Sequence, residues 1–229
     1  MPSHTHAKDR RRSRSFRGVA SVLALTTTLG VTLAACGDDS DGGPPSATQT
    51  ARNGDVYNKA DVSFASDMIQ HHAQALQMVV VADAHQLDPE VTQLAESIRA
   101  AQTPEIETMV DWLTAWDKKM PRTAMDHGNA GHDMDDPSAM GDMSHMEGLE
   151  GSEDMPGMMS ADQMQKLGDA SGAEFQDMWL EMMVEHHEGA IEMARSERED
   201  GTFSEAIELA KNIESAQEKE IEQMEGLLG

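Results

Sequence analysis

One stretch of about fifty residues occurs twice in this chain, with the copies 115 positions apart. The copies span residues 64–113 and 179–228, and they align without a gap. Each contains a Met-x-x-His-His motif, at residues 68–72 in the first copy and 183–187 in the second. An internal repeat constrains the architecture strongly, because both copies must form the same unit and the two units must pack together.

Apolar residues within each copy recur three or four positions apart, which predicts amphipathic helices. Asp88-Pro89 interrupts the first copy, where Asp88 can cap a helix and Pro89 suits its first position. In the second copy, the segment 202–205 (Thr-Phe-Ser-Glu) resembles a capping box after Gly201. Connections this short force neighbouring helices to be antiparallel. The sequence therefore predicts an all-α fold, a four-helix bundle built from two tandem antiparallel helical hairpins.

The first 35 residues have a basic start followed by an uncharged, mostly apolar run, which is typical of a secretory signal. The run ends in Leu-Ala-Ala-Cys36, which resembles a bacterial lipobox and implies lipidation of Cys36. Because Cys36 is the only cysteine, disulfides and thiolate clusters are excluded. Residues 36–57 are poor in large apolar side chains and are predicted to be a flexible tether. We expect an exported protein, lipid-anchored on the outer face of the cytoplasmic membrane, with residues 58–229 forming the bundle.

The chain carries a formal charge of −25, and residues 1–35 contribute +5, so the remainder carries about −30. Such an acidic surface repels the phosphate backbone, and we therefore expect no nucleic-acid partner. The sequence predicts no particular oligomeric state.

Between repeat 1 (about 58–118) and repeat 2 (about 160–229), the segment of about 119–159 has no helical or strand period. It is rich in methionine and histidine, whose thioether and imidazole groups suit copper ions. Biased composition alone, as in a low-complexity linker, is the alternative. A capping box at residues 160–163 then predicts a short helix to about Ala170. The weaker candidate ligands of the segment are Met125, His127, His132, Met134, Met140, Met143, His145, Met146, Met155, Met158 and Met159.

The paired histidines of the repeats are the main candidate metal ligands. Met68 lies three and four positions before His71 and His72, where side chains on a helix can share a ligand. A stripe on each partner helix supplies a glutamate and a methionine. The alternative is that one histidine of each pair hydrogen-bonds the glutamate in a satisfied polar core, with the methionines as ordinary core residues. The full candidate set is Met68, His71, His72, Met78, Glu105, Met109, Met183, His186, His187, Met193, Glu220 and Met224.

The Met-x-x-His-His motif, followed by Ala and Met and then by Gln-x-x-Glu-Ile-x-x-Met, resembles the DUF305 family. The likeness covers roughly residues 58–229, apart from some of the central segment. It implies an exported bacterial protein with a ferritin-like helical bundle, and some members of the family are implicated in copper binding or resistance.

These observations favour a protein that binds or buffers copper, as Cu(I) or Cu(II), and that is not an enzyme. A metal-free structural or interaction module of the cell envelope is the first alternative. A ferritin-like di-metal redox protein is the second, but it is disfavoured because Met68 and Met183 stand where a Glu-x-x-His pair would place glutamate.

Overall fold

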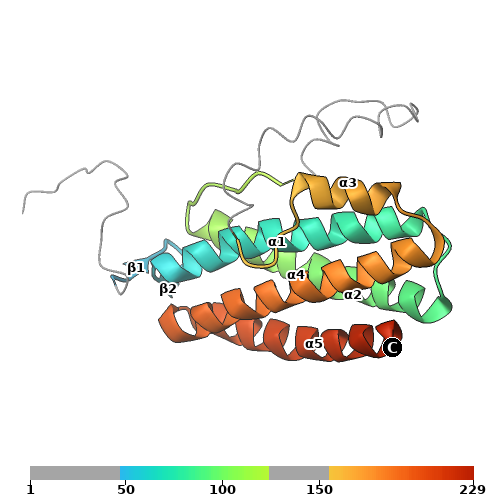
Figure 1. The fold of residues 1–229 in the computed structure, drawn as a ribbon. Coiled ribbons are helices and arrows are strands. Elements are labelled where there is room, and N and C mark those ends of the chain that lie inside the picture. The colour runs from blue at the N-terminus through green and yellow to red at the C-terminus, as the bar shows by residue number, and fades with distance from the viewer. Residues whose placement is uncertain (1–46, 124–154) are drawn as a thin grey trace, which may run out of the picture. The chain divides into compact units, whose positions relative to one another are not determined.

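The computed structural model describes residues 47–123 and 155–229. Four long helices form two antiparallel hairpins, α1 with α2 and α4 with α5, and the main contact between the hairpins is made by α1 and α4. Figure 1 shows the short helix α3 on the outside of the bundle, and among the helices its main contact is with α4. The predicted all-α fold is confirmed. The elements are β1 (Gln49–Thr50), β2 (Val56–Tyr57), α1 (Lys59–Asp83), α2 (Pro89–Ala115), α3 (Ala161–Asp169), α4 (Gly172–Asp200) and α5 (Ser204–Leu228).

Two of the helices begin with a complete capping box. Asn58 caps α1 with Asp61 as its partner, and Ser160 caps α3 with Gln163, as predicted for α3. The capping box predicted at Thr202 is wrong, because α5 begins at Ser204 after Phe203 and has no side-chain cap bond of its own. Asp88 does hold the N-cap position of α2, but its side chain makes no cap bond either.

The caps that α2 and α5 lack locally are supplied by the opposite repeat. Asp61 of α1 accepts hydrogen bonds through Oδ1 from the backbone N–H groups of Thr202 and Phe203, both at 2.9 Å. Gln176 of α4, which is 115 positions after Asp61, accepts one through Oε1 from the backbone N–H of Asp88 at 2.9 Å. Each repeat thus satisfies the free N–H groups at the start of the other repeat's second helix.

A small β-hairpin precedes α1 and was not predicted. Its Tyr57 is buried and stacks on Trp116, with ring centroids 4.5 Å apart, and the indole N–H of Trp116 donates to Asp55 Oδ2 at 3.1 Å. The tether prediction therefore does not hold for residues 49–57. Tyr57, the aromatic residue of this otherwise polar stretch, attaches the hairpin to the bundle through its stacking on Trp116.

Two apolar clusters fill the bundle. Each of the four long helices also contributes buried polar side chains to the interior. The first cluster includes Met78, Leu94 and Trp179, and the second includes Phe64, Leu113 and Ile213. None of the helices in the described ranges is long and apolar enough to cross a membrane.

Candidate metal centre

All four histidines of the two motifs lie inside the bundle. His71 and His72 on α1 and His186 and His187 on α4 are each 0% exposed. The imidazoles of His71 and His186 face each other across the contact between α1 and α4, with ring centroids 3.8 Å apart. The structure therefore brings together the histidines of the two repeats. We call these four residues the histidine layer.

The outer histidine of each pair binds the glutamate of its own hairpin. His72 Nε2–H donates to Glu105 Oε2, and His187 Nε2–H donates to Glu220 Oε2, both at 2.8 Å. These are the bonds that the polar-core alternative predicts. They are also the second-shell arrangement of many metal sites, in which a carboxylate orients an imidazole and fixes its tautomer. With Nε2 protonated, Nδ1 of His72 and of His187 carries the lone pair.

Several ring nitrogens of the histidine layer have no hydrogen-bond partner although they are buried. They are Nδ1 of all four histidines and, in addition, Nε2 of His186. Burial, assisted by neighbouring His72, lowers the pKa of His71 to about 3, and burial lowers the pKa of His186 well below its ordinary value. Both central imidazoles are therefore neutral at physiological pH, which is the form that binds metal ions.

Two glutamines extend the polar interior. Gln102 and Gln217, which precede the two glutamates by three positions, are 2% and 3% exposed. Neither amide atom of Gln102 has a hydrogen-bond partner, and the carbonyl oxygen of Gln217 also lacks one. The side-chain amides of both glutamines are therefore buried with hydrogen-bonding groups that have no protein partner.

A short segment before α3 closes over one side of the histidine layer. Its Pro156 carbonyl accepts a hydrogen bond from His71 Nε2 at 3.0 Å. Gly157 has a φ of +72°, and a Cβ on Gly189 of α4 would lie 2.0 Å from the Pro156 oxygen. Only glycine therefore permits this close approach. We call residues 155–159 the lid segment.

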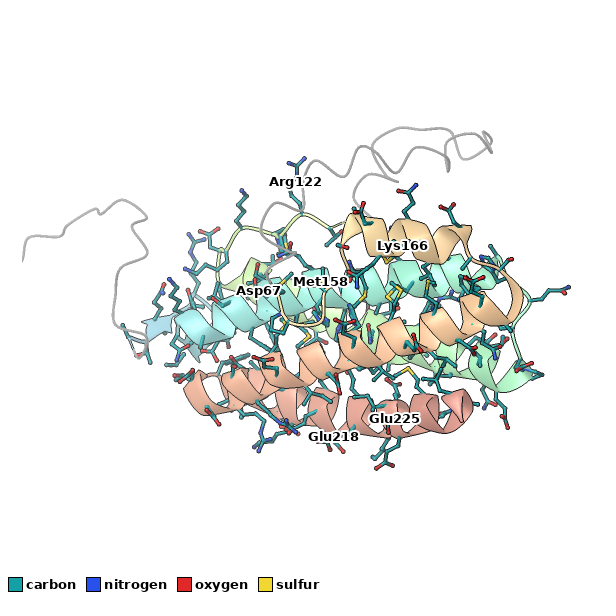
Figure 2. All side chains as sticks on the ribbon, viewed as in Figure 1. Asp67, Arg122, Met158, Lys166, Glu218 and Glu225 are labelled. Carbon is teal, nitrogen blue, oxygen red and sulfur yellow. The ribbon has the colours of Figure 1, made fainter. Side chains whose placement is uncertain are left out.

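The lid segment is held at its far end by a side-chain amide. Gln74 of α1 donates from Nε2 to the Met159 carbonyl at 2.8 Å and accepts from the Met159 N–H at 2.7 Å. Residues 155–159, although part of the central segment without helical or strand period, are therefore fixed against α1. Met159 is buried, and Met155 and Met158 are half-buried; Figure 2 shows Met158 on the same side of the bundle as Asp67.

The methionines of the candidate set lie in the apolar clusters. Met68 and Met109 pack in the cluster that contains Phe64, while Met78, Met183 and Met224 pack in the cluster that contains Trp179. All five are 0% exposed, whereas Met193 is half-buried at the edge of the Phe64 cluster. Their surroundings are those of core residues. Met68 and Met183 remain one helical turn from the histidines, as their spacing requires.

The remaining candidates lie outside the described residues. They are Cys36 and the loop residues Met125, His127, His132, Met134, Met140, Met143, His145 and Met146.

Within the described ranges, no three or more His, Cys, Asp or Glu side chains are arranged to hold a metal ion together. An ion at the histidine layer would therefore take at most two of these side chains as donors and would need other ligands beside them. Unpartnered neutral imidazoles next to thioethers fit a softer ion, because imidazole with thioether suits copper. The residues present thus fit copper by donor chemistry.

The sequence did not reveal the residues that close the site. Pro156 uses its backbone carbonyl, and the side chain of Gln74 binds the backbone of Met159. Both roles therefore depend on contacts between segments 85 positions apart in the sequence. Gly189 was detectable in principle. A glycine inside a long helix costs about 1 kcal/mol relative to alanine and therefore indicates close packing.

The fold and site define a class of protein, the duplicated helical-hairpin bundle with a buried layer of paired histidines and glutamates. The family described as "Domain of unknown function (DUF305)" matches residues 61–228, and the chain belongs to this family, which confirms the resemblance. No curated protein matches the chain.

Solved structures share the fold. A DUF305 protein of Streptomyces coelicolor, described as secreted, is 31% identical over 74% of this chain and 91% of that one, with a TM-score of 0.58. A DUF305 fragment from Deinococcus radiodurans is 24% identical over 79% and 99%, with a TM-score of 0.59. CopM in a Cu(II)-bound form is 25% identical over 73% and 95%, with a TM-score of 0.54.

Proposed function

We propose that this protein is an exported copper-binding protein that buffers the ion or confers resistance to it, and that it is not an enzyme. The observation that carries the proposal is the set of unpartnered imidazole nitrogens in the histidine layer. A buried polar group without a partner costs about 1–3 kcal/mol. Such a cost is understandable where a ligand supplies the missing partner.

The donors assigned to the ion are His71 and His186, whose rings face each other, with Met68 and Met183 as neighbouring thioethers. Glu105 and Glu220 orient the outer imidazoles rather than bind the ion, because their carboxylates already accept the Nε2–H groups. Bound copper would supply the positive partner for the lone pairs of the imidazoles. The likeness to CopM, which has a Cu(II)-bound form, supports copper over other soft ions.

The resemblance of Cys36 and its flanks to a lipobox supports attachment to the outer face of the membrane through a lipid. The secreted relative from Streptomyces coelicolor supports export. The methionine- and histidine-rich loop would then add weaker sites that exchange copper with the histidine layer.

An anaerobic Cu(I) competition titration tests the proposal. The chain from residue 37 is compared with a His71→Ala/His186→Ala variant and with a variant that lacks residues 124–154. His85→Ala is the matched control, because His85 stacks on Phe175, with centroids 3.7 Å apart, outside the layer. We expect the tightest site to disappear only in the double variant. Equal binding by the double variant and the His85→Ala control would refute the assignment to the layer.

A further inference from the structure

We propose that a small acidic pocket between α1 and α4 is the route by which a copper ion reaches the histidine layer. The inference rests on the proposed function, because it assigns an entry site to the same metal centre. A route is required, since all four histidines are 0% exposed.

The pocket meets the layer at the lid segment. It has a volume of about 270 Å³, and its walls include Ser63 and Asp67 of α1 and Glu192 and Asp200 of α4. Pro156 also lines it, and the carbonyl of this same residue accepts the hydrogen bond from His71. One residue of the lid segment therefore separates the pocket from the nearest imidazole.

The charges of the pocket favour a cation. Asp67, Glu192 and Asp200 line it, and none of its described lining residues is basic. Asp67 is half-buried, so its carboxyl is partly removed from water. Clefts lined by one sign of charge concentrate counter-ions and raise association rates by roughly 10–1,000-fold.

A buried carboxyl also lines the pocket. Glu197 is only 2% exposed and lies beside the Asp61 carboxyl. Burial, together with hydrogen bonding to Asp61, raises the pKa of Glu197 to about 9. Glu197 is therefore neutral at pH 7, and the negative charge of the pocket comes from its other carboxylates.

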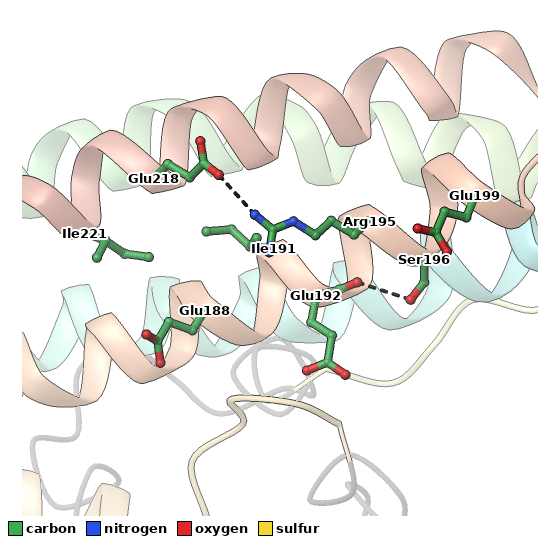
Figure 3. A pocket seen from close by; sticks show the side chains of 8 residues that line it. All are labelled: Glu188, Ile191, Glu192, Arg195, Ser196, Glu199, Glu218 and Ile221. Carbon is green, nitrogen blue, oxygen red and sulfur yellow. Dashed lines mark hydrogen bonds and ion pairs between the residues drawn. The ribbon is translucent and has the colours of Figure 1, made fainter.

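A larger groove between α4 and α5 shows that acidity alone does not carry the inference. It has a volume of about 520 Å³ and is lined by Glu188, Glu199 and Glu218, among others (Figure 3). Arg195 also lines it and donates to Glu218 at 3.2 Å, and no lid residue is among its lining residues. This groove provides the matched control.

The test compares two charge-matched variants by anaerobic stopped-flow mixing with Cu(I) at low ionic strength. The pocket variant is Asp67→Asn/Asp200→Asn, and the groove variant is Glu188→Gln/Glu218→Gln; Glu192 is left unchanged because it lines both hollows. We expect the association rate constant to fall about tenfold or more in the pocket variant and less than about threefold in the groove variant. Stoichiometry should be unchanged in both.

Equal slowing in both variants, or no slowing in the pocket variant, would overturn the entry route while leaving the metal centre intact. Failure of the unsubstituted protein to bind Cu(I) would instead refute the proposed function. Asp67→Asn alone repeats the comparison, with a fall of about threefold, if the double variant does not fold.

Discussion

Replacing His186 with leucine is expected to stabilise the metal-free protein. His186 is 0% exposed and neither of its ring nitrogens has a hydrogen-bond partner. Two unsatisfied polar atoms cost about 1–3 kcal/mol each, and an imperfect fit of the leucine returns up to about 1.5 kcal/mol of that gain. The free energy of unfolding should therefore rise by about 0.5–6 kcal/mol.

The matched variant is His187→Leu, one residue along the same helix. His187 has one unpartnered nitrogen, but its Nε2–H donates to Glu220, whose side chain is only 16% exposed. A hydrogen bond to a charged group contributes about 1.5–3 kcal/mol, so the gain and the loss nearly cancel. We expect stability to be unchanged or lower in this variant.

The assay is urea unfolding, with thermal unfolding as a second measure, in the presence of a chelator. In a domain of this size each 1 kcal/mol corresponds to about 2–4 °C in Tm. Copper should then raise the Tm of the unsubstituted protein but not that of His186→Leu, because only ligands bound to the folded state stabilise it. A loss of about 1 kcal/mol or more in metal-free His186→Leu would refute the reasoning and favour a purely structural role for the layer.

Three further predictions test other parts of the structure. The stability of the unsubstituted protein should fall as pH rises from about 5 to 9, because the carboxyl of Glu197 keeps its proton to about pH 9 in the folded state but loses it near 4.5 in the unfolded state. Glu197→Gln should abolish this fall, whose slope is at most ~1.4 kcal/mol per pH unit. Urea unfolding at several pH values measures the slope, and an unchanged slope in the variant would exclude this carboxyl as the cause. Gly189→Ala should lower stability by about 1–3 kcal/mol, because its methyl group would meet the Pro156 carbonyl, whereas Gly226→Ala, with nothing within 4 Å, should raise it by about 0.5–1 kcal/mol. Equal thermal shifts for these two glycine variants would contradict the close packing of the lid. Asp61→Ala should cost about 2–4 kcal/mol in chemical unfolding, because three backbone N–H groups lose their acceptor, and a loss below 1 kcal/mol would show that they find another.

The repeat and the helical periodicity made much of the fold predictable. Helix boundaries followed from local signals such as Pro89 and Ser160. The pairing of each outer histidine with its glutamate also appeared in advance, as the polar-core alternative. Local chemistry decides these features, so a single sequence can show them.

The features that the sequence did not predict all join distant segments. Thr202 has the local pattern of a capping box, but a carboxylate 141 positions away serves the start of α5 instead. The hairpin at residues 49–57 and the lid segment likewise depend on contacts with helices far along the chain. Tertiary packing determines which distant residue makes each contact, and the residue type at one position does not predict it.

The lid segment also breaks the symmetry of the duplicated chain. Two identical hairpins would give His71 and His186 equivalent surroundings, as Glu105 and Glu220 still do for the outer pair. The connection between the repeats exists only once, and its Pro156 carbonyl reaches only His71. The Pro156 carbonyl therefore fixes the tautomer of one central imidazole and does not act on the other. Fusion of two equal halves has in this way produced two chemically distinct nitrogen donors, a difference that a symmetrical pair of identical chains would not have.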